Sequence, residues 1–178
     1  PTAAPKPVPR EPAKKVDSKD FDSDDEEAAM LMNMETCKGT FGAQVKMALG
    51  TFTNEVMAEM SGIMATACAD SFDFKVNPGT ADELIMTADF GTVMGAIWPT
   101  WAGFVNTKYE NIRFEQQAND TIVVTQMANS HLPQADGTPI PCTETSFQFT
   151  HTVAYKDSKI VAWKQVYDTA VLAGSRAA

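Results

Sequence analysis

The chain of 178 residues has a formal net charge of -9 and 44% apolar residues, which is typical of one globular domain with a sizeable core. The excess of acids argues against nucleic acid or an anionic membrane as the main partner. No run of about 18 apolar residues occurs, so we expect no transmembrane segment. The three cysteines and two histidines are widely spaced, and we therefore expect no disulfide framework, no metal and no cofactor.

Residues 1–30 are expected to form an extended tail in front of a folded domain at residues 31–178. The stretch PTAAPKPVPREPAKK is proline-rich and basic, and VDSKDFDSDDEEAAM after it is acidic. Such a segment should be disordered alone, so we expect it to lie along a partner protein, although a helix could begin between Asp24 and Lys38. The chain begins without methionine, and an organellar location (chloroplast or mitochondrion) after removal of a targeting peptide is a hypothesis.

Helical and strand patterns alternate in the next part of the chain. Apolar residues recur at three- and four-residue steps from about residue 45 to residue 67, which predicts a helix with a possible break near Gly50. SFDFKV alternates as a strand and stops at the turn NPG. Thr80 and Glu83 have the spacing of a capping box, which predicts a short helix there. Residues 92–105 predict another helix, bent or interrupted at Pro99.

The second half of the chain changes to the two-residue period of strands. YENIRFEQQ and IVVTQMANSH predict one hairpin, and TSFQFTHTVAYK and KIVAWKQVYD predict a second hairpin across Asp157 and Ser158. Helices followed by such a meander indicate the α+β class, with a curved antiparallel sheet wrapped around the helices.

Pairing from a two-residue turn predicts the faces of this second hairpin. Lys156 should face Lys159, and the ladder should then place Thr152 opposite Trp163 and Thr150 opposite Gln165. One face becomes an amphipathic wall of hydroxyls, amides and rings: Thr150, Thr152, Trp163, Gln165 and Tyr167. His151 is expected on the other face, away from this wall.

The layout resembles the nuclear transport factor 2-like superfamily, and within it the SnoaL-like branch. The likeness covers about residues 40–175 and rests on the stretches ACADSFDFKVNPG, IWPTWAGF and FTHTVAYKDSKIVAWKQVYDTAVLAG. It implies a cone-shaped α+β barrel with a pocket at its open end, often dimeric through the sheet. The family contains isomerases, cyclases, dehydratases and epoxide hydrolases as well as non-catalytic binding and scaffold domains, so the fold alone does not determine the function.

The resemblance also marks two positions at which relatives carry a proton-abstracting carboxylate. The isomerase-like position, just after the first strand, matches Asn77, and the cyclase-like position on the last strand matches Gln165. Amides cannot accept a proton near neutral pH, and a general base is worth about 10²–10⁴ in rate. We therefore predict no catalytic residue, while Asn77 and Gln165 could still bind a ligand.

Three functions stay open at this point. The leading hypothesis is a non-catalytic accessory or scaffold subunit of a larger assembly, which docks through residues 1–30 and the sheet and could form a homodimer. The second is a site for a small apolar ligand in a pocket lined by aromatic side chains: Trp98, Trp101, Trp163 and Tyr167. The third is an isomerase, dehydratase or cyclase using an acid such as Asp73 or Asp168, the latter turned into the pocket by a one-residue register slip.

Overall fold

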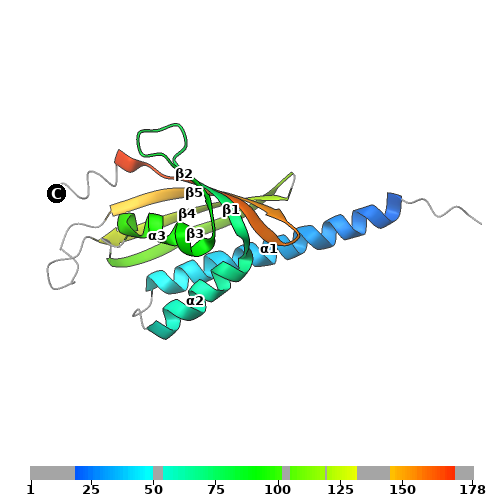
Figure 1. The fold of residues 1–178 in the computed structure, drawn as a ribbon, viewed down its shortest axis with the longest axis horizontal. Helices are drawn as coiled ribbons and strands as arrows, with labels where there is room; N and C mark the ends of the chain where they lie inside the picture. The colour runs from blue at the N-terminus through cyan, green and yellow to red at the C-terminus, as the bar shows by residue number, and fades with distance from the viewer. Residues whose placement is uncertain (1–18, 50–53, 102–104, 119, 132–144, 171–178) are drawn as a thin grey trace, which may run out of the picture.

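The computed structural model describes residues 19–49, 54–101, 105–118, 120–131 and 145–170. Its elements in chain order are α1 (Lys19–Leu49), α2 (Asn54–Ala67), β1 (Cys68–Val76), β2 (Leu84–Ala88), α3 (Phe90–Trp101), β3 (Val105–Gln117), β4 (Thr121–His131), β5 (Thr145–Lys156) and β6 (Lys159–Val166). The strands form one curved, open sheet in the order β2-β1-β6-β5-β4-β3, and α1 and α2 lie side by side against it (Figure 1). This architecture confirms the predicted α+β class.

The sheet is mixed, whereas the sequence predicted a purely antiparallel one. β1 pairs with β2 in antiparallel fashion but with β6 in parallel fashion. The last strand therefore lies between the first strand and β5, in the middle of the sheet. This topology brings the C-terminal ends of β1 and β6 together, although the two strands are far apart in the sequence.

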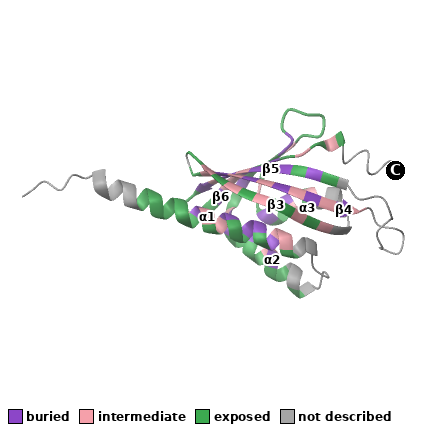
Figure 2. Ribbon diagram, turned by 180° about the vertical axis from the view of Figure 1, so that it is seen from behind, coloured by how far each residue is buried: buried purple, intermediate pink, exposed green. Residues whose placement is uncertain are grey.

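The N-terminal boundary differs from the predicted one. α1 begins at Lys19, so residues 19–30, which composition assigned to an extended tail, are helical, and residues 1–18 lie outside the described part of the chain. Acids near the N-terminus of a helix interact favourably with its dipole, which is consistent with this early start. The first half of α1 extends beyond the sheet (Figure 1), where Figure 2 shows residues 25–32 as exposed. From residue 25 on, where burial is described, the first buried residue is Asn33.

Two helices lie in the region where the sequence predicted one helix with a possible break: α1 ends at Leu49 and α2 begins at Asn54. Gly50, where the break was predicted, lies outside the described residues. A helix occupies most of residues 92–105 as predicted, and α3 continues through Pro99 as far as its last residue, Trp101. Its start is capped by Asp89 Oδ1, which accepts a hydrogen bond from the backbone N–H three residues later (3.0 Å).

The predicted short helix at Thr80 is wrong, because the chain forms a turn that leads into β2. Thr80 Oγ1 donates to the backbone carbonyl of Asn77 (2.9 Å) and accepts from the backbone N–H of Asp82 (3.2 Å). Glu83 Oε2 accepts from the backbone N–H of Gly79 (2.5 Å). The side chains that resembled a capping box therefore close the connection between β1 and β2.

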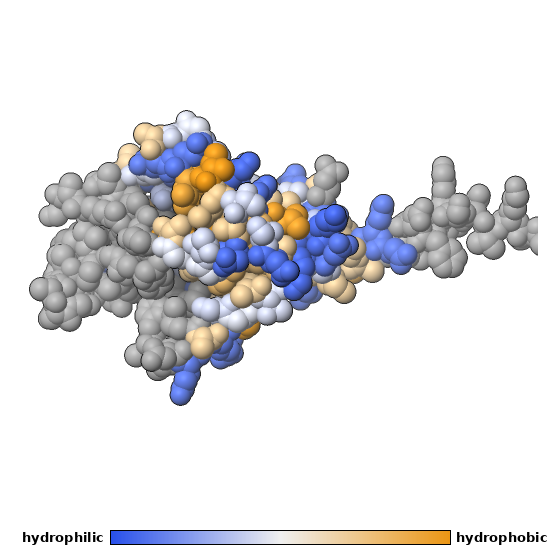
Figure 3. Space-filling view, in the orientation of Figure 1, coloured by the Kyte–Doolittle hydropathy of each residue, from blue (hydrophilic) through white to orange (hydrophobic). Residues whose placement is uncertain are grey.

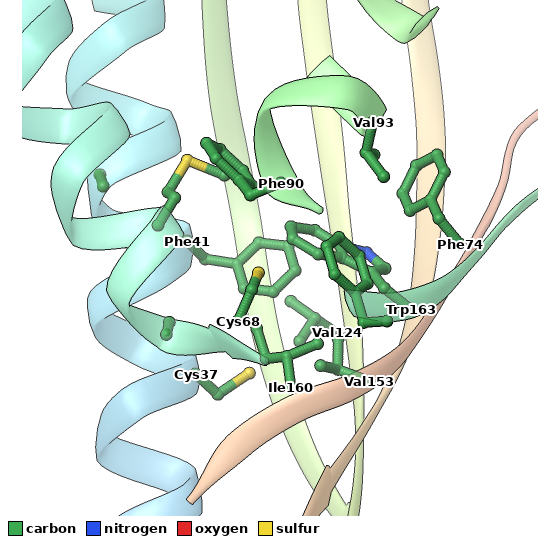
Figure 4. Packing of buried hydrophobic residues seen from close by; sticks show 14 of the residues in the cluster. Cys37, Phe41, Cys68, Phe74, Phe90, Val93, Val124, Val153, Ile160 and Trp163 are labelled. Atoms are coloured by element: carbon green, nitrogen blue, oxygen red, sulfur yellow. The ribbon is translucent and has the colours of Figure 1, made fainter. Parts of the chain in front are cut away.

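Phe41 of α1 lies at the centre of the core. Its ring centroid is 6.1 Å from that of Phe114, 4.9 Å from that of His151 and 5.5 Å from that of Trp163. Figure 4 shows Phe41 and Trp163 above an aliphatic layer from β4, β5 and β6, which consists of Val124, Val153 and Ile160. The helix thus fills the concave side of the sheet with an aromatic side chain.

Phe41→Ala is expected to lower the free energy of unfolding by about 3–5 kcal/mol, because it leaves a cavity among these rings. Leu31→Ala on the same helix is the control: Leu31 is 59% exposed, and its loss should change stability by less than about 0.5 kcal/mol. Urea titrations followed by tryptophan fluorescence measure both. Equal losses in the two variants would contradict the central position of Phe41.

Candidate functional site

The β5–β6 hairpin turns as the sequence predicted. Asp157 and Ser158 both have left-handed backbone, with φ of 50° and 60°, as the tight hairpin turn matched to strand twist requires. Lys156 pairs with Lys159 across the turn. The first step of the predicted ladder is therefore confirmed.

An extra residue on β6 then changes the register. Tyr155 pairs with Ile160, and Ala154 pairs with Ala162, so Val161 between them has no partner on β5. This is a β-bulge, in which two residues on one strand oppose one on the other. Beyond Val161 every pair between β5 and β6 is shifted by one residue from the register that the two-residue turn predicts.

Because of this shift, two pairs predicted from the sequence are wrong: Thr150 with Gln165, and Thr152 with Trp163. His151 instead lies opposite Gln165, and Val153 lies opposite Trp163. The two threonines are half-buried on the outer face, whereas His151 is fully buried on the inner face beside Trp163 and Gln165. The wall facing the helices thus carries an imidazole where hydroxyls were expected.

Four polar side chains form a continuous chain through the core, from α1 across β4 and β5 to β6. Trp163 Nε1–H donates to His151 Nδ1 over 3.1 Å, and His151 Nε2 lies 3.1 Å from the amide nitrogen of Gln126. The same nitrogen of Gln126 lies 3.3 Å from Gln44 Oε1. The chain connects the helix to the middle of the sheet.

The partners of His151 determine where its proton lies. An indole N–H can only donate, so Nδ1 of His151 must accept, and the one proton of the neutral ring lies on Nε2. Gln126 must then turn its amide oxygen towards Nε2–H, since the oxygen and nitrogen of a terminal amide exchange places by a half-turn. The amide of Gln44 must also make a half-turn, so that its nitrogen donates to the amide oxygen of Gln126. His151 is therefore a neutral imidazole with both ring nitrogens engaged.

Burial lowers the pKa of His151 to about 3 from its ordinary value of 6.5. Phe149 stacks on the imidazole at a centroid distance of 5.7 Å, and Phe41 and Trp163 meet it edge-on. The buried polar side chains of the described part are all uncharged: Asn33, Thr40, Asn77, Gln126, Ser130, His151 and Gln165. His151 therefore does not serve as a proton acceptor near neutral pH.

Sequence reasoning missed both Gln126 and the inward position of His151. A signal for Gln126 was present, because it follows Ile122 and Val124 at two-residue steps on the buried face of β4. A polar residue in an apolar register predicts a buried hydrogen-bond partner. His151 carried the same signal, because it stands at two-residue steps between Phe149 and Val153 on the buried face of β5. The sequence did not show that the bulge on β6 brings Trp163 and Gln165 to this face.

Asn77 and Gln165, the two positions that the resemblance matched to the bases of relatives, lie side by side where β1 and β6 end. The backbone N–H of Asn77 donates to the backbone carbonyl of Gln165 (2.9 Å), and Asn77 Oδ1 accepts from the backbone N–H of Tyr167 (2.9 Å). Asn77 has a φ of 41°, a left-handed backbone that asparagine adopts more readily than most residues. Its Nδ2 is buried without a hydrogen-bond partner among the described groups.

Aromatic rings lie next to this junction. The ring of Tyr167 is 5.3 Å from that of Phe149, and Phe147 lies 6.2 Å from Phe149 on the same strand face. The amides and these mutually tilted rings make a mainly apolar wall with few polar groups. The side chains of Trp98 and Trp101, which the sequence predicted to line a pocket with Trp163 and Tyr167, lie outside the described residues.

The two acids considered as alternative bases are exposed. Asp73 Oδ1 accepts from Thr87 Oγ1 (2.7 Å), and Asp168 Oδ1 accepts from the backbone N–H of Ala170 (2.9 Å). A one-residue shift is present in the hairpin, but it brings Trp163 and Gln165 to the face of His151 and leaves Asp168 exposed. Throughout the portion that the structure describes, no carboxylate is buried.

In the described part of the chain, neither the cysteines nor any group of possible metal ligands forms a catalytic or metal site. Burial raises the pKa of the Cys37 and Cys68 thiols to about 11, which makes both poor nucleophiles. Within the described ranges, no group of three or more His, Cys, Asp or Glu side chains could hold a metal ion. No helix in those ranges combines the length and the hydropathy needed to span a membrane. Cys142 lies outside them.

No family model matches the chain, and no curated protein does either. Solved structures match it over most of its length. An NTF2-like protein from Burkholderia pseudomallei has a TM-score of 0.60 and 14% identity, with 83% of this chain and 98% of that one covered. A candidate isomerase from Bacillus subtilis has a TM-score of 0.57 and 9% identity, with coverage of 82% and 95%. TerC, co-crystallised with polyporic acid, has a TM-score of 0.57 and 11% identity, with coverage of 83% and 99%.

The chain therefore has the nuclear transport factor 2-like fold, as the resemblance implied. At identities of 9–14% the likeness concerns the fold, and the function must be argued from the residues of this chain.

The buried neutral His151 predicts a pH dependence of stability. Its pKa in the folded chain, about 3, is below the ordinary 6.5, so between these values the unfolded chain binds one more proton. The free energy of unfolding should therefore be highest above about pH 6.5 and fall by roughly 1.4 kcal/mol per pH unit below it on account of this group alone.

His151→Gln should remove this part of the slope, whereas His131→Gln, which replaces the other histidine, should retain it. Urea titrations between about pH 4 and about pH 7 measure the three slopes. Identical slopes for the wild type and His151→Gln would show that His151 is not buried in its neutral form.

Proposed function

We propose that the chain is a small-molecule-binding protein that holds a neutral, flat compound with a carbonyl oxygen against the junction of β1 and β6. The observation that supports this most directly is the Nδ2 of Asn77, which has no hydrogen-bond partner among the described residues and belongs to a residue that is 2% exposed. A buried donor without a partner costs about 1–3 kcal/mol. A carbonyl oxygen of a ligand would supply the missing acceptor.

The uncharged wall favours a neutral ligand. The buried polar groups near the junction are amides, and His151 is neutral with its pKa lowered by burial. A charged ligand would lose its hydration there without meeting an opposite charge, which is strongly unfavourable.

The rings of Phe149 and Tyr167 favour a flat ligand, because aromatic faces pack best against other flat rings in offset arrangements. The structure of TerC with polyporic acid supports an organic ligand in a protein of this fold. The candidate isomerase of the same fold indicates that relatives of this shape can perform chemistry. In this chain amides occupy the two base positions, so we favour binding without proton transfer.

Matched ligands test the hydrogen bond to Asn77. 9-Fluorenone should bind about three- to tenfold more tightly than fluorene, which has the same ring system without the oxygen, because one hydrogen bond contributes about 0.5–1.5 kcal/mol. Asn77→Asp should abolish this preference, since Asp retains the oxygen that accepts from Tyr167 N–H but lacks the Nδ2 donor. Isothermal titration calorimetry measures the affinities.

Asn111→Asp is the matched control. Asn111 also has left-handed backbone, with a φ of 55°, and is exposed on β3, so this change should leave the preference for 9-fluorenone intact. Equal affinities of the wild type for the two compounds would contradict the proposal, as would the same loss in both variants.

The absence of proton transfer is tested with 1-indanone, a flat ketone with C–H bonds next to its carbonyl. In deuterated water the protein should not accelerate exchange of these hydrogens above the uncatalysed rate, as followed by proton NMR. Protein-dependent exchange would indicate a base that neither Asn77 nor Gln165 can provide.

A further inference from the structure

The first half of α1 leaves the body of the protein where the helix crosses two hairpin tips. Asn33 Nδ2 donates to Asp120 Oδ1 in the β3–β4 turn (3.2 Å), and the sulfur of Met32 accepts from the hydroxyl of Ser158 in the β5–β6 turn (2.9 Å). On the N-terminal side of this crossing, residues 25–31 are all exposed (Figure 2). The helix continues there without support from the sheet.

This projecting segment carries an exposed apolar band at residues 28–32, with the sequence Ala-Ala-Met-Leu-Met. Met30 is 38% exposed, Leu31 59% and Met32 58%. Successive residues of an α-helix are rotated by about 100°, so five consecutive residues surround the helix. Figure 3 shows pale-orange atoms on this part of α1 next to blue, hydrophilic ones.

A block of acids precedes the band. Residues 20–27 of α1 contain six of them: Asp20, Asp22, Asp24, Asp25, Glu26 and Glu27. Like charges three or four residues apart destabilise an isolated helix by about 0.2–0.5 kcal/mol per pair, and a short unsupported helical segment is marginal in water. A basic surface beside the block would relieve this repulsion.

We propose that residues 20–32 of α1 dock in an apolar groove of a different protein whose rim carries lysine and arginine. A groove is required because the apolar band surrounds the helix, and a flat surface would leave much of the band in water. Insertion of an apolar helix into a groove is an established mode of recognition. The acids select a basic rim. A second copy of the chain would present the same acidic helix, so two copies would repel each other there.

Photochemical cross-linking tests this surface in the full chain. p-Benzoylphenylalanine in place of Leu31 should give, in an extract of the cells that produce the protein, an adduct with another protein. The cross-linked segment should contain apolar residues flanked by lysine or arginine. The same photoreactive residue in place of Glu35, which is exposed on the supported half of α1, is the control and should give no such adduct.

Charge reversal separates specific docking from incidental capture. Asp25→Lys, Glu26→Lys and Glu27→Lys together should reduce the adduct yield about tenfold or more, because they remove the attraction to the basic rim. An adduct that survives these changes, or that forms equally from position 35, would overturn the proposal.

Two further measurements address other occupants of the band. Light scattering should give the same mass for the wild type and for Leu31→Glu with Met32→Glu; a dimer that this variant loses would assign the band to a second copy and overturn the proposal. Flotation of the wild type with vesicles of phosphatidylcholine and phosphatidylserine would also overturn it, whereas no flotation is expected because the acids repel an anionic surface.

Discussion

The arrangement of the interior depends on the extra residue Val161 in β6. In a regular strand, side chains three positions apart point to opposite faces. Ile160 and Trp163 nevertheless both face the helices, because the extra residue between them reverses the face of every later residue of β6. The same insertion shifts the pairing with β5, so that His151 comes to lie next to Trp163 and receives its N–H. The link between Trp163 and the rest of the polar chain is therefore a consequence of one unpaired residue.

The side chains of this polar chain are uncharged, and the charged residues in the described part of the protein lie outside the core. The chain carries a net charge of -9, and six of its acids are concentrated in the first turns of α1, while the buried polar groups near Phe41 are amides, hydroxyls and an uncharged imidazole. The molecule thus separates a neutral interior, suited to an uncharged ligand, from a charged projection, suited to a basic partner. The two proposed roles use different surfaces and can be fulfilled at the same time.

Much of the fold could be predicted from the sequence, because strand periodicity and turn residues are local signals. The faces of Trp163 and Gln165 on β6 could not, since a bulge has no fixed sequence pattern; the available signal was that Ile160 and Trp163 are both large and apolar at an odd spacing. Thr80 and Glu83 misled because the same side-chain bonds to backbone N–H groups can cap a helix or close a turn. Composition also misled for residues 19–30, because helix formation there continues from the packed half of α1. The proximity of Asn77 and Gln165 required the family resemblance, since the two are distant in sequence.

Pro78, the residue after Asn77, affects how readily the side chain of Asn77 loses its amide. Asparagine converts to aspartate when the backbone nitrogen of the following residue attacks its side-chain carbonyl and forms a cyclic imide, and Pro78 has no backbone N–H to lose in that step. The side-chain amide of Asn77 is therefore protected against deamidation through the cyclic imide. A protein that uses the Nδ2 donor of Asn77 would therefore not lose it by this route.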